Sequence, residues 1–362
     1  MMDRARTLAR AAKLRARFEA AGAAPVETPV LMPAGTLLDL YGEDIRARAY
    51  VTSDALRGEQ MLRPDFTLPV VQMHMEHGAG PARYTYSGEV FRRQEDDPDR
   101  ANEYIQVGYE VFDRSDAADA EAEVFALISD ALGGLKLRAA TGDIGILMAA
   151  VSGLETTERR KAALMRHIWR PRRFRALLDR FSGRAPVPDT RAALLATDDP
   201  FAGIAPMVGR RSMAEVEERI EALRVDAATP PISEREMGAL ETLLDVRETI
   251  PNALAHLHDV AVDLPAILPA LDRLKSRADA LAAHGIDVST LDFEASYGRT
   301  SMEYYDGFVF GFYAERRPDL PPIASGGRYD ALTRQLGKGA EIPAVGGVLR
   351  PGLMLELEEA AT

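Results

Sequence analysis

An amphipathic pattern covers the start of the chain and predicts a helix from about Asp3 to Ala21. The apolar positions of this helix are Leu8, Ala11, Leu14 and Phe18. Gly22 follows it, at the place where glycine commonly ends a helix. From Ala24 to Met32 apolar residues alternate with prolines, and this pattern favours extended chain.

Strand-like runs at Ala82–Tyr86 and Tyr104–Phe112 are separated by a very polar segment from Arg93 to Asn102. This arrangement predicts two long antiparallel strands that are joined by a charged loop. We expect a helix next, at about Ala117–Leu132.

The pattern is almost wholly helical from about Leu154 to His284. Ser212 with Glu215, and Ser233 with Glu236, fit the capping box that opens many helices. The apolar stripes of the two helices that follow consist of Met213, Val216, Ile220 and Leu223, and of Met237, Leu240 and Leu244.

Strand signals return after Gly285, at Thr300–Tyr313, near Ile323 and from Ala344 onward. The simplest interpretation of this pattern is a mixed sheet with a block of helices inserted into it. The predicted fold class is therefore α+β. A length of 362 residues suggests two domains rather than one.

The composition, with 46% hydrophobic and 28% charged residues, is that of an ordinary globular protein. No apolar run is long enough for a membrane-spanning helix, and the segment Met1–Arg17 lacks the apolar core of a signal peptide. We therefore expect a cytoplasmic protein. The absence of cysteine excludes disulfides, thiolate metal sites and a cysteine nucleophile, and the spacing of the six histidines does not suggest zinc, so we expect no metal.

The net charge of −12 argues against a protein whose main partner is a nucleic acid. One stretch is nevertheless strongly basic. It contains Arg159, Arg160, Lys161, Arg166, Arg170, Arg172, Arg173, Arg175, Arg180 and Arg184. This stretch is either a solvated helical face or a docking patch for an acidic partner or an RNA backbone.

Three clusters of polar residues suggest a binding site. The first is Leu62–Thr67, in which Asp65 and Thr67 would share one side of an extended chain and could hold an ammonium group. The second places Gln106 and Glu110 on the same face of a strand, after Phe91 and Arg92. The third consists of Glu303–Gly307 and Ser325–Asp330. Taken singly, each cluster could also be a turn or part of a half-buried core.

The order and spacing of these segments resemble histidyl-tRNA synthetases, a class II family with an antiparallel active-site sheet. Ala24–Pro33 looks like the first motif, which forms dimers, and Tyr84–Phe112 looks like the second. Glu303–Tyr305 resembles the family's Tyr-Tyr segment, Ser325–Asp330 its Gly-Gly-Arg-Tyr-Asp segment, and Pro343–Gly347 the start of the third motif.

The resemblance implies a class II synthetase-like core made of residues 1–135 and 286–362, with a mainly helical insertion at 136–285. The synthetases continue after the third motif into an anticodon-binding domain. This chain stops at Thr362, so we expect that domain to be absent and expect no tRNA partner.

The resemblance also implies a pocket for free histidine. The residues that it assigns to this pocket are Asp65, Thr67, Arg92, Gln106, Glu110, Tyr304 and Tyr305. Asp65, Thr67 and Gln106 would surround the amino group of the ligand. Glu110 and the two tyrosines would hold its imidazole, and Arg92 would lie near its carboxylate. Polar partners of this kind discriminate strongly against amino acids that lack the ring.

The sequence departs from the synthetases on the side where ATP would bind. The family has an arginine where Thr300 stands, and Arg299 comes one residue early, which on a strand turns a side chain to the other face. Gln94 occupies the place of an acid in the second motif. Arg350 comes three residues before the arginine of the third motif, near Leu353, and is followed by a proline. We expect these changes to abolish adenylate formation, which requires cations at the phosphorus.

Among synthetase-like families the chain most resembles the regulatory subunits of ATP phosphoribosyltransferase in bacterial histidine biosynthesis. That resemblance implies a non-catalytic subunit without cofactor. It would form a homodimer through the first motif, activate a short catalytic subunit and transmit feedback inhibition by histidine. The alternatives are a degenerate or truncated histidyl-tRNA synthetase that still forms histidyl-adenylate, and a synthetase-like protein that senses another amino acid or tRNA.

Overall fold

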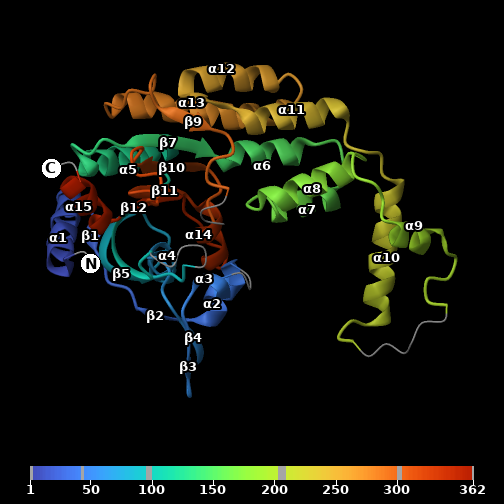
Figure 1. The fold of residues 1–362 in the computed structure, drawn as a ribbon, viewed down its shortest axis with the longest axis horizontal. Helices are drawn as coiled ribbons and strands as arrows, with labels where there is room; N and C mark the ends of the chain where they lie inside the picture. Colours follow the sequence, from blue (N-terminus) through green and yellow to red (C-terminus); the bar gives the residue numbers. More distant parts are fainter. Residues whose placement is uncertain (1–2, 42–44, 95–99, 203–208, 300–303, 361–362) are drawn as a thin grey trace.

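The computed structural model describes residues 3–41, 45–94, 100–202, 209–299 and 304–360 (Figure 1). Most of the strands form one sheet. In spatial order this sheet contains β1 (Ala24–Pro25), β5 (Ala82–Phe91), β6 (Glu103–Phe112), β12 (Ala344–Leu349), β11 (Ala324–Arg328), β10 (Phe308–Tyr313), β7 (Arg138–Asp143), β9 (Asp292–Glu294) and β8 (Arg247–Thr249). A smaller sheet has the order β2 (Leu31–Pro33), β4 (Gly58–Leu62) and β3 (Val51–Asp54).

Helices surround the larger sheet (Figure 1). Those outside the predicted insertion are α1 (Arg4–Ala20), α2 (Ala34–Tyr41), α3 (Ile45–Arg48), α4 (Thr67–Glu76), α5 (Ala117–Leu132), α14 (Asp330–Leu336) and α15 (Pro351–Ala360). Those within it are α6 (Ile144–Gly153), α7 (Glu158–Arg166), α8 (Pro171–Phe181), α9 (Asp189–Ala196), α10 (Met213–Ala228), α11 (Glu234–Asp245), α12 (Ile250–Val260), the 3-10 helix η1 (Pro265–Ile267) and α13 (Leu268–Ala283).

The middle of the larger sheet is antiparallel. Strands β5 and β6 pair along their whole length, from Ala82 opposite Phe112 to Phe91 opposite Glu103. Strand β12 pairs with β6 and β11, and β10 joins β11 to β7. Because side chains alternate across a strand, each of these strands contributes to both faces of the sheet.

The two faces of the sheet have different contents. One face carries Val107, Tyr109 and Phe310, which pack with α1, α5 and α13 into the larger apolar core. The other face carries Tyr86 and Phe112 and packs against α4 and α14 in a second apolar cluster. The polar residues predicted to bind a ligand lie on this second face, between the sheet and α4.

A buried ionic network fastens the sheet to the helical layer. Arg277 of α13, only 3% exposed, donates to Glu121 of α5 and, over 2.6 Å, to Asp143 at the end of β7. Arg328, at the end of β11, donates to the other oxygen of Glu121 and, over 3.0 Å, to Asp330. Burial would raise the pKa of Glu121, but the two arginines hold it below its usual value, so the carboxylate stays ionised.

Several local predictions are confirmed. Helix α1 begins after Asp3, whose carboxylate accepts from the backbone of Ala5, and Gly22 follows it with φ +96°. Helix α5 has the predicted bounds. Both capping boxes are present, at Ser212 and Ser233.

Another local prediction is wrong. Strand β10 begins at Phe308 rather than at Thr300, and residues 300–303, which include Thr300 and Glu303, lie outside the described part. The segment predicted to be almost wholly helical does consist mainly of helices, and β8 is a short strand within it.

The predicted insertion divides into two parts in space. Strands β7 and β8 belong to the larger sheet, and α13 packs on α5. Helices α9 and α10, by contrast, stand apart from the sheet on the right of Figure 1. We propose that the insertion comprises residues 136–285, as the sequence predicts.

Candidate functional site

Glu110 lies at the centre of the candidate site. Its side chain is fully buried on β6 and accepts three hydrogen bonds. Thr67 Oγ1, at the start of α4, and the Tyr86 hydroxyl, on β5, donate to Oε1 over 3.0 and 2.8 Å. The hydroxyl of Tyr329, just after β11, donates to Oε2 over 2.5 Å. Four segments that are distant in sequence thus meet at one carboxylate.

Glycines on the neighbouring strands provide the space for these side chains. A Cβ atom at Gly346 of β12 would overlap the carboxylate of Glu110. A Cβ atom at Gly108 would overlap the ring of Tyr86, and one at Gly327 would come within 2.8 Å of the ring of Tyr305. The Gly-Gly pairs of β11 and β12 therefore matter here because they lack a side chain.

The electrostatics of Glu110 are dominated by desolvation. Burial raises its pKa to about 7, against the opposing effect of the hydrogen bonds from Tyr329, Tyr86 and Thr67. Burial also raises the pKa values of Tyr86 and Tyr329 well above 10, with a further contribution from Glu110. Both phenols therefore remain protonated donors, and the carboxyl of Glu110 can change its charge near neutral pH.

Asp65 and Thr67 lie at the start of a helix rather than on an extended chain, so that part of the prediction is wrong. Thr67 is the first residue of α4, and Asp65, 3% exposed, accepts from the backbone N–H of Leu68 over 3.3 Å. Arg92 is held at the end of β5, where its Nε donates to the carbonyl of Pro64 over 2.7 Å. The turn before α4 is thereby fixed beside the strand that carries Tyr86.

Tyr304 and Tyr305 close another side of the site. Their ring centroids are 4.8 Å apart, and the ring of Tyr304 meets that of Tyr329 at 6.1 Å. The pKa of Tyr305 is raised by burial, then by the charge of Glu110, and it also responds to Asp65 and Arg92. These residues therefore surround Tyr305 closely enough to act on its charge.

Gln106 is buried on the same face as Glu110, as the strand period predicts. Among the described residues, neither its amide oxygen nor its amide nitrogen has a hydrogen-bond partner. A buried amide without partners is uncommon in proteins and calls for a ligand or water with both a donor and an acceptor.

Two residues of the site were not among the predicted ones. Tyr86 lies opposite Gly108 in the β5–β6 register, and therefore shares its face. The strand period could have identified it, had the register been known. Tyr329 lies in the Gly-Gly-Arg-Tyr-Asp segment that the sequence singled out, but nothing in the sequence indicates that its hydroxyl would reach Glu110.

The residues that depart from the synthetase pattern fall in different places. Arg299, 5% exposed, faces the insertion, where its Nε donates to the carbonyl of Ile168 over 2.8 Å and its guanidinium lies 4.7 Å from the ring centroid of Phe174. Arg350 is half-buried beside Tyr104, with its guanidinium 5.9 Å from the ring centroid. Burial lowers the pKa of Arg350, and the charge of Arg92 lowers it further.

No group of three or more His, Asp or Glu side chains in the described part of the chain is arranged to hold a metal ion. None of its helices is long and apolar enough to cross a membrane.

The chain matches known proteins over nearly its whole length. The family model described as histidyl-tRNA synthetase matches residues 2–199 and 202–351. The ATP phosphoribosyltransferase regulatory subunits of Brucella anthropi and Brucella canis are each 32% identical over 360 residues, which cover 92% of this chain and 93% of each relative.

Solved structures support the same fold. A protein described as an ATP phosphoribosyltransferase regulatory subunit/histidyl-tRNA synthetase from Bacillus halodurans has a TM-score of 0.66 and 21% identity, covering 97% of this chain and 79% of that one. A histidine–tRNA ligase subunit from Alicyclobacillus acidocaldarius has a TM-score of 0.60 and 24% identity, covering 98% and 93%. The predicted fold, an α+β class II synthetase-like sheet flanked by helices, is confirmed.

Proposed function

The chain belongs to the histidyl-tRNA synthetase family, among its ATP phosphoribosyltransferase regulatory subunits, and from this premise we propose that it binds free histidine at Glu110 and thereby controls a separate catalytic subunit. The observation that carries the proposal is the pairing of a buried carboxyl with a buried amide that has no hydrogen-bond partner in the described part of the chain. Glu110 and Gln106 face one space on β6, and Glu110 titrates near neutral pH. Free histidine offers both a ring N–H and an ammonium group.

The ligand's groups can be assigned to the pocket one by one. The imidazole N–H would donate to Glu110, whose Oε2 accepts only from Tyr329 among the hydrogen bonds of the described residues. The ring would lie against Tyr304 and Tyr305. The ammonium group would donate to Asp65, to the Gln106 amide oxygen and to the hydroxyl oxygen of Thr67, and the carboxylate would meet Arg92. A buried site of this composition favours histidine over amino acids without a ring N–H.

We infer that the chain has no catalytic role of its own and acts through its partner. The relatives are named regulatory subunits, which implies a catalytic ATP phosphoribosyltransferase as partner. In the proposed mechanism this partner is the short catalytic subunit that performs the first step of histidine biosynthesis. The regulatory chain activates it, and histidine in the Glu110 pocket inhibits it. The two effects amount to a coupling free energy between sites on two chains.

One observation favours a second candidate, the formation of histidyl-adenylate. The positive charge of Arg92 lowers the pKa of Arg350, and two such cations beside the pocket could stabilise a phosphoryl group. Arg299 argues against this candidate, because it is engaged with Ile168 and Phe174 of the insertion. Exchange of labelled pyrophosphate into ATP, dependent on histidine, would establish the adenylate reaction and refute the regulatory proposal.

We also propose that the chain forms a homodimer through the first motif. The smaller sheet presents apolar side chains to solvent there. They are Val30, Leu31, Val51 and Leu56, with exposed fractions of 40%, 49%, 43% and 97%. A group of exposed aliphatic residues on one small sheet is typical of a protein–protein interface.

The proposed function is tested by assaying the catalytic subunit from the same genome with ATP and phosphoribosyl pyrophosphate, with and without this chain, across a histidine titration. We expect activation by the wild-type chain, and inhibition by histidine only when the chain is present. Glu110→Gln should retain activation and require more histidine for inhibition. Absence of both activation and complex formation would refute the proposal.

A further inference from the structure

Helix α10 forms an arm that is attached to the rest of the protein near its C-terminal end. There Asp226 accepts from Arg160 of α7 and from Arg180 of α8, each over 2.7 Å. The preceding turns of α10 stand clear of the sheet and have α9 beside them (Figure 1). The arm is therefore held firmly at one end and accessible at the other.

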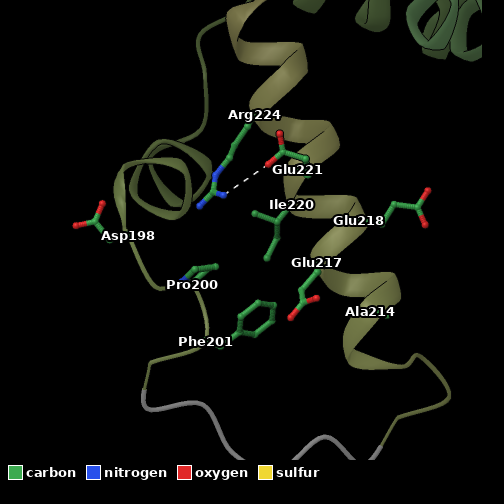
Figure 2. A pocket seen from close by; sticks show the side chains of 9 residues that line it. All are labelled: Asp198, Pro200, Phe201, Ala214, Glu217, Glu218, Ile220, Glu221 and Arg224. Carbon is green, nitrogen blue, oxygen red and sulfur yellow. Dashed lines mark ion pairs between the residues drawn. The ribbon is translucent and has the colours of Figure 1, made fainter.

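An open cavity of about 420 Å³ lies along this arm (Figure 2). Its lining consists of Asp198, Pro200, Phe201, Ala214, Glu217, Glu218, Ile220, Glu221 and Arg224. Figure 2 shows Phe201 and Ile220 facing each other across its interior, while Glu218 projects outward from α10. The predicted apolar stripe of α10 is thus only partly covered, because Ile220 is 7% exposed but Met213 is 41% exposed.

Three of the four acids that line this cavity make no ion pair with the described residues. The arginines at the base of the arm are engaged elsewhere, since Arg175 and Arg184 pair with Glu241 and Arg160 pairs with Asp226. Within the cavity, Arg224 pairs with Glu221 at 3.6 Å. No ion pair in the described part of the chain involves Asp198, Glu217 or Glu218. The described lining therefore places four carboxylates against one guanidinium around an apolar interior.

We propose that this cavity docks a basic segment of the catalytic ATP phosphoribosyltransferase subunit. An apolar side chain of that segment enters between Phe201 and Ile220, and flanking lysines or arginines pair with Glu217, Glu218 and Asp198. That the partner is the catalytic subunit rests on the proposed function. That its docking segment is basic and carries an apolar side chain is inferred from the charge and shape of the cavity. Opposite charges at the rim accelerate encounter and select the partner, and the buried apolar anchor slows dissociation.

Other occupants fit the cavity less well. Nucleic acids and anionic lipid surfaces are polyanions, and Glu217 and Glu218 would repel them. A metal ion would need convergent oxygen ligands, but no group of carboxylates in the described residues has that arrangement. A protein segment with basic and apolar side chains satisfies both the charge and the shape.

The proposal is tested with the double variant Glu217→Arg/Glu218→Arg in the full chain. Both side chains are exposed, and the Ser212–Glu215 capping box is left intact, so α10 should fold normally. The matched control is Asp259→Arg/Asp272→Arg, which makes the same charge change at exposed positions on α12 and α13. A third variant, Phe201→Ala, removes the apolar anchor without changing charge. Binding to the catalytic subunit is measured by calorimetry at low and high salt.

We expect the double variant to bind the catalytic subunit at least about tenfold more weakly at low salt, with a smaller salt dependence, because two attractive charges become repulsive. Phe201→Ala should weaken binding at both salt concentrations, and the control should bind like the wild type. Wild-type affinity in both the double variant and Phe201→Ala would refute the docking site and leave the proposed function standing.

Two further outcomes would also refute the docking site. Failure of the wild-type chain to bind the catalytic subunit would refute the proposed function and this inference with it. If the double variant instead changes the sedimentation of the regulatory chain alone, the cavity joins two copies of this chain.

Discussion

At the scale of single residues, Glu110 combines burial with three hydroxyl donors. Burial favours its protonated form and raises its pKa to about 7, while Tyr329, Tyr86 and Thr67 favour the ionised form. A ligand that donates an N–H to this carboxyl shifts the balance further toward the ionised form. Histidine binding and the ionisation of Glu110 are therefore linked.

This linkage predicts that histidine binds more tightly as the pH rises through about 7. The acid has a raised pKa, so it is mostly neutral at about pH 6 and mostly ionised at about pH 8. Glu110→Gln should weaken binding by about 1–3 kcal/mol at the higher pH, the usual effect of a mispaired buried polar group, and the difference should shrink at the lower pH. Calorimetric titrations of both proteins across this range test the prediction.

Comparing the wild type with Glu110→Gln separates the titration of Glu110 from that of the ligand. The titration of the unbound histidine imidazole near pH 6.5 is the same in both experiments. Equal pH dependence in the wild type and in Glu110→Gln would therefore show that Glu110 does not contact the ligand.

A second prediction concerns the space beside Glu110. Gly346→Ala would place a methyl group onto the carboxylate of Glu110 and within 2.9 Å of the carbonyl oxygen of Tyr109. We expect loss of histidine binding and a decrease of about 1–3 kcal/mol in the free energy of unfolding, as overpacked sites show. Gly238→Ala in α11 is the control, because nothing lies within 4 Å of its Cβ position. It should stabilise the protein by about 0.5–1 kcal/mol, measured by urea denaturation.

The sequence anticipated the pocket in part, for reasons that can be stated residue by residue. A strand period of two is enough to place Gln106 and Glu110 on one face. It does not reveal that Asp65 accepts from the backbone N–H of Leu68, since the conformation of that turn depends on Arg92 holding the carbonyl of Pro64. The contact between Tyr329 and Glu110 joins residues 219 positions apart and depends on the order of strands in the sheet.

At the scale of elements, helices whose sequences carry both a capping signal and an apolar stripe were predicted correctly. Helices α1, α10 and α11 were predicted from their caps and apolar spacing, and all three are present. Helix α4 lacks a side-chain cap and carries a proline in its first turn, so it was not predicted. Strand β7 was also missed, because it is stabilised by pairing with β10 rather than by an alternating pattern of its own.

The buried network of Arg277 gives a prediction about how the elements are held together. Arg277→Met removes the cation between Glu121 and Asp143, which are 4% and 2% exposed. Two carboxylates are then left buried with less compensation, and we expect a decrease of about 3–5 kcal/mol in the free energy of unfolding. Lys275→Met, two residues away on α13, breaks an exposed pair with Asp279 and should change the stability little.

Denaturant unfolding followed by circular dichroism compares the two variants directly. Similar midpoints for Arg277→Met and Lys275→Met would show that the network does not stabilise the fold. The result also has a bearing on function, because Arg328 of the network is the chain neighbour of Tyr329 in the pocket. Their side chains make contacts on opposite sides of the sheet, so this part of β11 touches both the pocket and the helical layer.

At the scale of the whole molecule, three surfaces are arranged around one sheet. The Glu110 pocket lies on the face covered by α4, the acidic cavity lies on the arm formed by α9 and α10, and the smaller sheet projects at the bottom of Figure 1. The smaller sheet has no covering element over its exposed aliphatic residues within the described part of the chain. This is the surface that we propose as the homodimer interface.

The homodimer proposal gives the last prediction. Leu31→Asp puts a carboxylate on the exposed surface of β2, where the wild-type side chain is 49% exposed, and a buried charge without a partner opposes association. We expect the wild-type chain to sediment as a dimer and Leu31→Asp to sediment as a monomer at the same concentration. Val262→Asp is the control, since Val262 is 80% exposed and follows α12, away from the smaller sheet. A dimer that survives Leu31→Asp and dissociates in Val262→Asp would place the interface on the insertion instead.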